Sequence, residues 1–283
     1  MISVGKQKHA AENKNAAEGN NPLGPGFGSE EPESGKPLRR VAVWGPPGSG
    51  KTTLAVRLAA EISSRPGIQV ILLLADRSVP VLPVLFPGYR ESELPSLGSA
   101  LSSVEMTARE VLSAATVCSE RANLLFLGYS VGENMLSYPE TGENRALSFL
   151  ELLDSLCDCL IVDCPPALRG DTLSSAAMKS ASAVLRLYTP EMRSFSFFDS
   201  QLPLMSGDEW RADRHLKILN NTGRDIFFPV DETRRNMLRC DAELPYSLRM
   251  KQAMSDGRLL SAAPEKRYAR SVRSIASMLT AGR

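Results

Sequence analysis

Residues 45–52, with the sequence GPPGSGKT, form the pattern with the clearest chemical meaning in the chain. They match GxxxxGK[ST], in which glycines bring backbone N–H groups close to an anion and the lysine contacts the β- and γ-phosphates of a nucleotide. The hydroxyl of Thr52 can ligate Mg²⁺. An apolar run at 40–44 precedes the pattern and a helical stretch begins at Lys51, so a helix N-terminus would add partial positive charge beneath the phosphates. This context favours a phosphate loop over a Gly/Pro turn before an ordinary helix.

Two aspartates are placed to work with such a loop. Asp163 ends the apolar run LIV at 160–162, within the stretch DCLIVDCPP, and Asp76 comes just after the run VILLL at 70–74. Open α/β sheets bind ligands outside the carboxyl ends of their strands, where a carboxylate can hold Mg²⁺ directly or through water. The sequence therefore predicts a carboxylate-bearing edge beside the phosphate loop.

The elements that would position these residues alternate between short apolar runs and longer helical patterns. Several apolar runs are continuous, as expected for parallel strands covered on both faces. The alternation predicts βαβ units in an α/β fold, with an open, doubly wound, mostly parallel sheet and helices on both faces. Strands are predicted at 41–44, 70–74, 124–127, 160–162, 183–187 and 216–219, and helices at 52–62, 108–115, 146–156 and 172–181.

Two later stretches complete a family pattern. Residues 216–221 read LKILNN, and residues 243–260 contain ELPY, KQA and GRLL. Together with the phosphate loop, the strand that ends before Asp76 and the run IVDCPP at 161–166, they resemble the ParA/MinD class of P-loop ATPases. The resemblance covers residues 39–283, and the DCPP form is most similar to the pilus-associated TadZ/CpaE branch. Relatives in that branch usually carry a receiver-like N-terminal domain, whereas a short polar tail precedes the matching region here.

The resemblance implies an ATP site. Lys51 and Asp76 would take part in hydrolysis, Asp76 by orienting the attacking water. Thr52 and Asp163 would organise Mg²⁺, and Asn220 would recognise adenine. The residues implied to bind the nucleotide are Gly45, Pro46, Pro47, Gly48, Ser49, Gly50, Lys51, Thr52, Thr53 and Asn220.

Two positions depart from the family pattern. Pro46 stands where the class has an extra lysine that reaches the partner's ATP in a sandwich dimer, and Leu74 replaces the first aspartate of its DxD motif. A proline cannot neutralise charge that develops on the γ-phosphate. We therefore expect slow hydrolysis, or turnover that needs an activating partner, in a nucleotide-dependent homodimer. Arg77 is a candidate substitute for the missing charge.

Composition narrows the class of protein. The 283 residues carry 33 Lys and Arg against 32 Asp and Glu, a net charge of +1 that argues against a strongly basic nucleic-acid coat. Without an apolar run of about 18 residues or an export signal, no transmembrane segment is predicted, and the five cysteines indicate reduced thiols in the cytoplasm.

Residues 1–38 are predicted to be a disordered polar tail and residues 39–283 a single P-loop ATPase domain. Cys157, Cys159 and Cys164 are expected to fill the core rather than bind a metal.

These features predict a Mg-ATP-binding, slowly hydrolysing ATPase that acts as a localisation or assembly switch for a pilus, secretion or conjugation machine. Its protein partners would belong to that membrane-associated machine. A pseudo-ATPase scaffold is one alternative. The C-terminal pattern at 263–283 favours a helix packed on the sheet over one that binds the membrane surface peripherally. A DNA-partition ATPase is a further alternative, with backbone contacts from Arg211, Arg214, Lys217, Arg234, Arg235 and Arg239.

Overall fold

The computed structural model describes residues 39–89, 94–222 and 239–280, so the polar tail predicted at 1–38 lies outside the described residues. The described strands form one eight-stranded sheet with the order β3-β4-β2-β5-β1-β6-β7-β8. All neighbours pair in parallel except β3 and β4, which are antiparallel. The predicted α/β class is therefore confirmed. The strands are β1 (Arg39–Trp44), β2 (Val70–Leu74), β3 (Thr116–Cys118), β4 (Arg121–Gly128), β5 (Cys159–Asp163), β6 (Ala183–Tyr188), β7 (His215–Thr222) and β8 (Ala242–Pro245).

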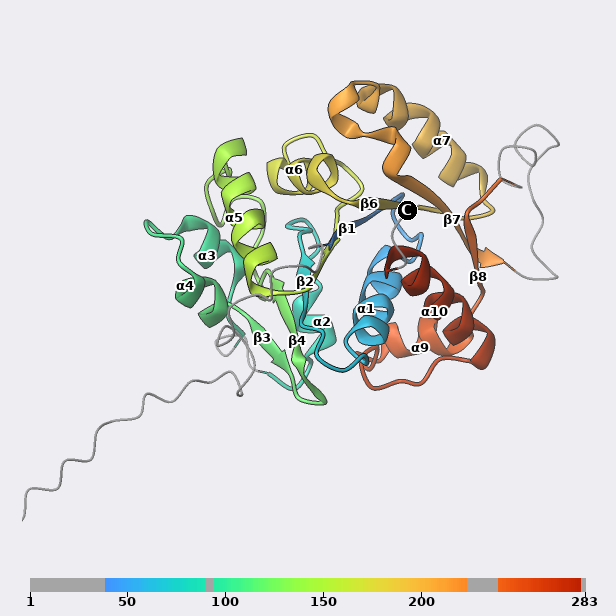
Figure 1. Ribbon diagram of the computed structural model, residues 1–283, viewed down its shortest axis with the longest axis horizontal. Helices are drawn as coiled ribbons and strands as arrows, with labels where there is room; N and C mark the ends of the chain where they lie inside the picture. Colours follow the sequence, from blue (N-terminus) through green and yellow to red (C-terminus); the bar gives the residue numbers. More distant parts are fainter. Residues whose placement is uncertain (1–38, 90–93, 223–238, 281–283) are drawn as a thin grey trace, which may run out of the picture.

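Helices cover both faces of this sheet (Figure 1). One face carries α1 (Lys51–Ile62), α2 (Leu82–Leu85), α9 (Leu248–Ser255) and α10 (Lys266–Thr280). The other face carries α3 (Leu97–Ser102), α4 (Ala108–Ser113), α5 (Glu143–Leu156), α6 (Thr172–Ser180) and α7 (Met192–Gln201). Three short 3₁₀ helices follow α7, at Leu202–Met205, Asp208–Trp210 and Ala212–Arg214.

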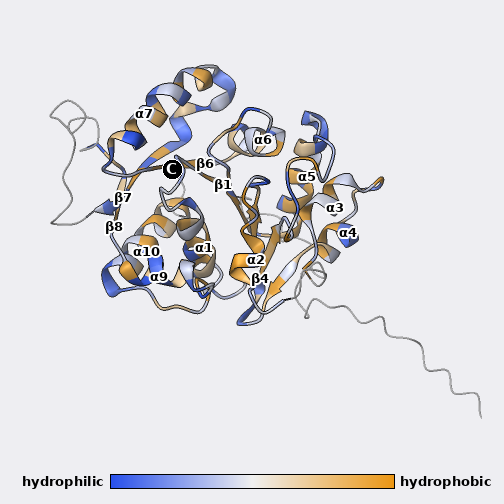
Figure 2. Cartoon of the chain, turned by 180° about the vertical axis from the view of Figure 1, so that it is seen from behind, coloured by the Kyte–Doolittle hydropathy of each residue, from blue (hydrophilic) through white to orange (hydrophobic). Residues whose placement is uncertain are grey.

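Two cores result from the alternation of side chains along the strands. Neighbouring residues of a strand point to opposite faces, so β1 places Val41 and Val43 in the core under α1 and Ala42 and Trp44 in the core under α5 and α6. All five residues of β2 are buried, as expected for a central parallel strand. Figure 2 shows apolar colouring along the strands and mixed colouring on the outer helices.

The central strands bring the predicted site residues to one edge. β1 lies between β5 and β6, and both Val43 of β1 and Leu74 of β2 are level with Asp163 at the end of β5. The loops that follow these three strands therefore open at the same place, outside the carboxyl ends of parallel strands, where this class of sheet binds ligands.

The C-terminal helix packs as its sequence pattern predicts. Tyr268, Val272 and Ile275 of α10 are buried in the core beneath it. The guanidinium of Arg57, on α1, donates to the carbonyl oxygens of Leu259 (3.3 Å) and Ala262 (3.1 Å), which ties α1 to the segment that leads into α10. Among the described helices, none has the length and apolar character needed to cross a bilayer.

The cysteines behave as core residues. Cys157, Cys159 and Cys164 are each buried, as predicted, and none of the three is in a disulfide. Burial raises the pKa of the Cys157 and Cys164 thiols well above the usual value, so both remain protonated at neutral pH. Over the described ranges, no group of three or more His, Cys, Asp and Glu side chains could hold a metal ion.

Candidate nucleotide-binding site

The phosphate loop is the segment between β1 and α1. Gly48 and Gly50 adopt φ angles of 74° and 88°, in the left-handed region that glycine enters without a steric penalty. The Ser49 N–H donates to the carbonyl oxygen of Pro46 at 3.2 Å, which closes a tight turn, and Gly50 caps the N-terminus of α1. The first N–H groups of a helix lack intrahelical partners, so this loop presents donors and the positive end of the helix dipole to an anion.

Lys51 lies folded over its own loop. Its side chain is almost fully buried, and Nζ donates to the carbonyl oxygen of Pro46 at 3.1 Å. Burial lowers the pKa of Lys51, while the carboxylates of Asp163 and Asp76 oppose that shift. A cation held this way, inside the curve of a loop of N–H donors, is suited to an anionic ligand.

Thr52 and Asp163 form the second part of the site. Thr52 Oγ1 donates to Oδ2 of Asp163 at 2.6 Å. Burial raises the pKa of Asp163 to about 6, and Asp76 adds to the shift, while Lys51 and the Thr52 hydrogen bond oppose it. The other oxygen of Asp163, Oδ1, is buried and has no hydrogen-bond partner. An orphaned carboxylate oxygen beside a threonine hydroxyl fits Mg²⁺, which prefers hard oxygen ligands.

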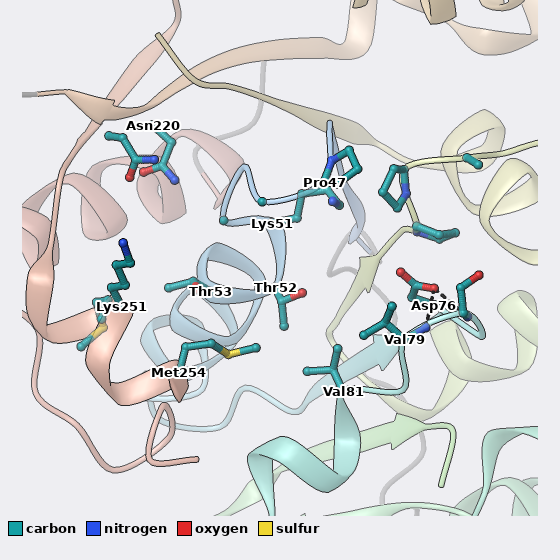
Figure 3. Close-up of a pocket in the computed structure, with 18 of the residues that line it drawn as sticks. Pro47, Lys51, Thr52, Thr53, Asp76, Val79, Val81, Asn220, Lys251 and Met254 are labelled. Atoms are coloured by element: carbon teal, nitrogen blue, oxygen red, sulfur yellow. Dashed lines mark hydrogen bonds between the residues drawn. The ribbon is translucent and has the colours of Figure 1, made fainter. Parts of the chain in front are cut away.

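Asp76 lies across the site from Thr52, on the loop that follows β2 (Figure 3). Its Oδ1 accepts hydrogen bonds from the backbone N–H groups of Ser78 (2.8 Å) and Val79 (3.2 Å). This Asx turn gives the loop a defined shape. The carboxylate is half-buried and lines the cavity, so it can reach a solvent molecule beside a bound phosphate.

Arg77 connects two loops of the site. Its Nη2 donates to the carbonyl oxygen of Gly170 at 2.8 Å, so the loop after β2 is joined to the loop after β5. Trp44, the last residue of β1, makes a similar connection, because its Nε1 donates to the carbonyl oxygen of Pro166 at 3.1 Å. The loop after Asp163 is thus held from two sides.

The loops enclose a cavity of about 1360 Å³. Figure 3 shows the phosphate loop at its centre, Asp76 at one end, and Asn220 with Lys251 at the other. The predicted residues that line it are Pro47, Gly48, Gly50, Lys51, Thr52, Thr53, Asp76 and Asn220. The remaining predicted residues support this wall: Gly45 backs onto β6, Pro46 accepts the Lys51 hydrogen bond, and Ser49 and Asp163 are buried.

Several lining residues carried no separate signal in the sequence. Asn221, Tyr246 and Lys251 line the end of the cavity near Asn220, and they come from the end of β7, the β8–α9 connection and α9. Tyr246 and Lys251 lie inside the stretch that resembles the family's IPY segment, but nothing in that pattern marks either as a cavity residue. Trp44 is buried in the core rather than part of the lining, and its hydrogen bond to Pro166 also had no signal in the sequence, since a strand-end tryptophan is usually a core residue.

Similar solved structures share this architecture. The chain is 19% identical to a ParA family ATPase from Chlorobium tepidum TLS, with a TM-score of 0.67 over 84% of this chain and 97% of that one. It is 18% identical to the septum site-determining protein MinD from Pyrococcus horikoshii OT3, solved with Mg-ADP, with a TM-score of 0.62 over 85% and 95%. For a Cyanothece McdA–ATP complex the values are 18% identity, a TM-score of 0.64, and coverage of 87% and 98%.

These likenesses show that the chain has the fold of ParA/MinD ATPases over nearly the full length of those proteins. No protein-family model and no curated protein matches the sequence.

Proposed function

We propose that the protein binds Mg-ATP in this cavity and hydrolyses it slowly, as a ParA/MinD-like ATPase. The observation that carries the proposal is the partly buried Thr52–Asp163 hydrogen bond, whose second carboxylate oxygen has no partner and whose carboxylate interacts electrostatically with the Lys51 ammonium. The fold neighbours support it, because one was solved with Mg-ADP and another with ATP.

Each residue has a role that its contacts support. The backbone N–H groups of residues 48–53 and the Lys51 ammonium bind the phosphates, while Thr52 and Asp163 would hold Mg²⁺. When bound there, the metal would neutralise the charge of the phosphates. Asp76 orients the attacking water from the opposite side. Phosphoryl transfer depends mainly on positioning and charge neutralisation, and these residues supply both.

The loop also supports slow turnover. Pro46 is buried and its carbonyl oxygen accepts the Lys51 hydrogen bond, so the position that carries an extra lysine in the class contributes no charge here. In phosphoryl transfer, a cationic group that stabilises the charge of the transition state typically contributes about 10³- to 10⁵-fold in rate. We propose that an activating partner, or Arg77 after release from Gly170, supplies this charge.

The connected loops after β2 and β5 support a role as a nucleotide-dependent switch. Asp76 and Asp163 precede loops that are joined through Arg77 and Gly170, so a γ-phosphate between them would act on both at once. Ordering of such loops by a γ-phosphate is a common two-state device. We propose that nucleotide state controls homodimerisation and the binding of protein partners in a pilus, secretion or conjugation machine, at the cytoplasmic side of a membrane.

Phosphate release at saturating Mg-ATP tests the activity. We expect slow release by the wild type and none by Lys51→Ala, whereas Lys266→Ala, a change at an exposed lysine outside the cavity, behaves like the wild type. Retained Mg-ADP binding without any release would select the pseudo-ATPase scaffold. Size-exclusion chromatography with ADP and with a non-hydrolysable ATP analogue tests dimerisation.

A salt-titrated DNA-binding assay with and without ATP separates the machine switch from a DNA-partition ATPase. Of the arginines considered for DNA contact, Arg211 and Arg239 are exposed, Arg214 donates to the carbonyl oxygen of Ala181 at 3.0 Å, and Arg234 and Arg235 lie outside the described residues. ATP-dependent DNA binding that weakens with salt would favour partition over the machine switch.

A further inference from the structure

The loop between β5 and α6, residues 164–171, lines the cavity beside the phosphate loop but offers few backbone donors close to β5. The Cys164 N–H donates to the carbonyl oxygen of Val43, on β1, at 3.0 Å. Pro165 and Pro166, which follow and line the cavity, have no N–H group. The part of the loop nearest β5 therefore has no backbone N–H free to bind a phosphate.

Farther along the same loop, Arg169 lies between two points at which the loop is held. The carbonyl oxygen of Pro166 accepts a hydrogen bond from the Trp44 indole, and that of Gly170 accepts one from Arg77. Arg169 itself is exposed and lines the cavity, and it makes no hydrogen bond or ion pair with any residue that the structure describes. Its guanidinium is therefore available to a ligand in the cavity.

The other cationic side chains in the described part of the cavity wall are placed differently. Lys51 and Arg77 each donate to a backbone carbonyl oxygen. Lys251 lies at the opposite end of the cavity from Asp76 (Figure 3). Arg169 belongs to the loop that is joined to the one after β2, so it supplies a positive charge at the Asp76 end that no contact already uses.

Negatively charged side chains also lie at this end of the cavity. Asp76 and Asp171 both line it, one on each of the two loops that Arg77 joins. A γ-phosphate that enters here brings further negative charge close to these carboxylates, and like charges at short range repel. An arginine offsets this repulsion, because its planar guanidinium can donate two N–H groups to the oxygens of one phosphate.

We propose that Arg169 binds the γ-phosphate and so allows the site to distinguish ATP from ADP. This inference rests on the proposed Mg-ATP site and names the residue through which the loop after β5 detects the third phosphate. Gly170, the next residue, has a φ angle of 77°, and a glycine can change its backbone conformation at little steric cost. Because Gly170 is joined to Arg77, a movement of Arg169 toward the phosphate also displaces the loop after β2.

The test is isothermal titration calorimetry of the full chain with ADP and with the non-hydrolysable analogue AMPPNP, each with Mg²⁺. Arg169→Ala should weaken AMPPNP binding roughly ten- to one-hundredfold, the range for hydrogen bonds to a charged group, and leave ADP binding unchanged. Arg169→Lys keeps the charge without the two-pronged geometry and should recover part of the loss. The matched control is Arg109→Ala, at an exposed arginine of α4 outside the cavity, which should bind both ligands like the wild type.

Two results would overturn the inference. In the first, Arg169→Ala binds AMPPNP as tightly as the wild type, which would make Arg169 a solvated side chain. In the second, Arg169→Ala weakens ADP and AMPPNP by the same factor, which would make its role one of support for the loop rather than recognition of the third phosphate. A wild type that binds neither ligand would instead refute the proposed nucleotide site itself.

Discussion

Two glycines of the phosphate loop allow steric and conformational costs to be separated. A Cβ atom on Gly45 would lie 2.6 Å from the backbone carbonyl oxygen of Leu187, on β6, whereas a Cβ atom on Gly48 would meet nothing within 4 Å. Gly48 instead has a φ of 74°, and Gly45 is not in the left-handed region. The replacement Gly45→Ala is thus a clash without backbone strain, and Gly48→Ala is backbone strain without a clash.

The magnitudes follow from these geometries. For Gly48→Ala the left-handed backbone costs about 1–2 kcal/mol, and the stiffer unfolded chain returns about 0.4–1 kcal/mol, so we expect a net loss of about 1 kcal/mol. For Gly45→Ala the neighbour is backbone in the parallel β1–β6 pairing, where Trp44 is level with Arg186, and it cannot rotate away. Overpacking of this kind costs about 1–3 kcal/mol, and the contact distance places Gly45→Ala near the upper end.

Urea unfolding of the nucleotide-free variants, followed by circular dichroism, measures both values. Gly45→Ala should shift the midpoint two to three times further than Gly48→Ala at an unchanged slope, in proportion to free energies of about 3 and 1 kcal/mol. A Gly45→Ala variant that is no less stable than Gly48→Ala would refute the reasoning. It would mean that β1 and β6 separate easily and that the fit of the loop against β6 is not what requires Gly45.

Three further predictions concern titration, loop anchoring and helix docking. Because the pKa of Asp163 is raised to about 6, protonation should weaken the Mg²⁺-dependent part of ADP affinity about tenfold between pH 7 and pH 5. Titration calorimetry at saturating Mg²⁺ measures this loss of affinity. The Asp163→Asn variant has no carboxyl group to titrate at this position and should not show the loss. The same shift makes the ligand-free protein gain stability from this group as the pH falls through 6, by about 1 kcal/mol at pH 5. Trp44→Phe removes the hydrogen bond to Pro166 and should lower the free energy of unfolding in urea by about 1 kcal/mol. Trp44→Ala also removes the packing of the ring and should lower it by roughly 3–5 kcal/mol. Equal losses of free energy in the two variants would contradict a separate role for the indole N–H. Arg57→Met should cost about 2 kcal/mol and speed amide exchange in α10, whereas Arg267→Met, at an exposed position of α10, should stay within about 0.5 kcal/mol.

The fold was predictable where a buried element consists of a short, continuous run of apolar residues. The run VILLL at 70–74 and the run at 160–162 are buried on both faces, so their apolar character shows without reference to any partner. By contrast, β3 has only three residues and pairs antiparallel at the sheet edge, and α7 carries Phe197 and Phe198 against Trp44. Neither has a local period long enough to reveal it, because each is defined by neighbours distant in the chain.

The same distinction divides the two ends of the cavity. In the proposed site, the phosphates would be bound by backbone N–H groups and a lysine that lie within eight consecutive residues, 45–52, so one contiguous pattern would supply the phosphate contacts. The end of the cavity near Asn220 is assembled from the tip of β7, the β8–α9 connection and α9. Asn220 supports the phosphate loop there through the 2.7 Å hydrogen bond from its Nδ2 to the carbonyl oxygen of Ser49, a contact across 171 positions of the chain. A single sequence predicts chemistry that is local to a loop, and it does not show a contact that joins two distant segments.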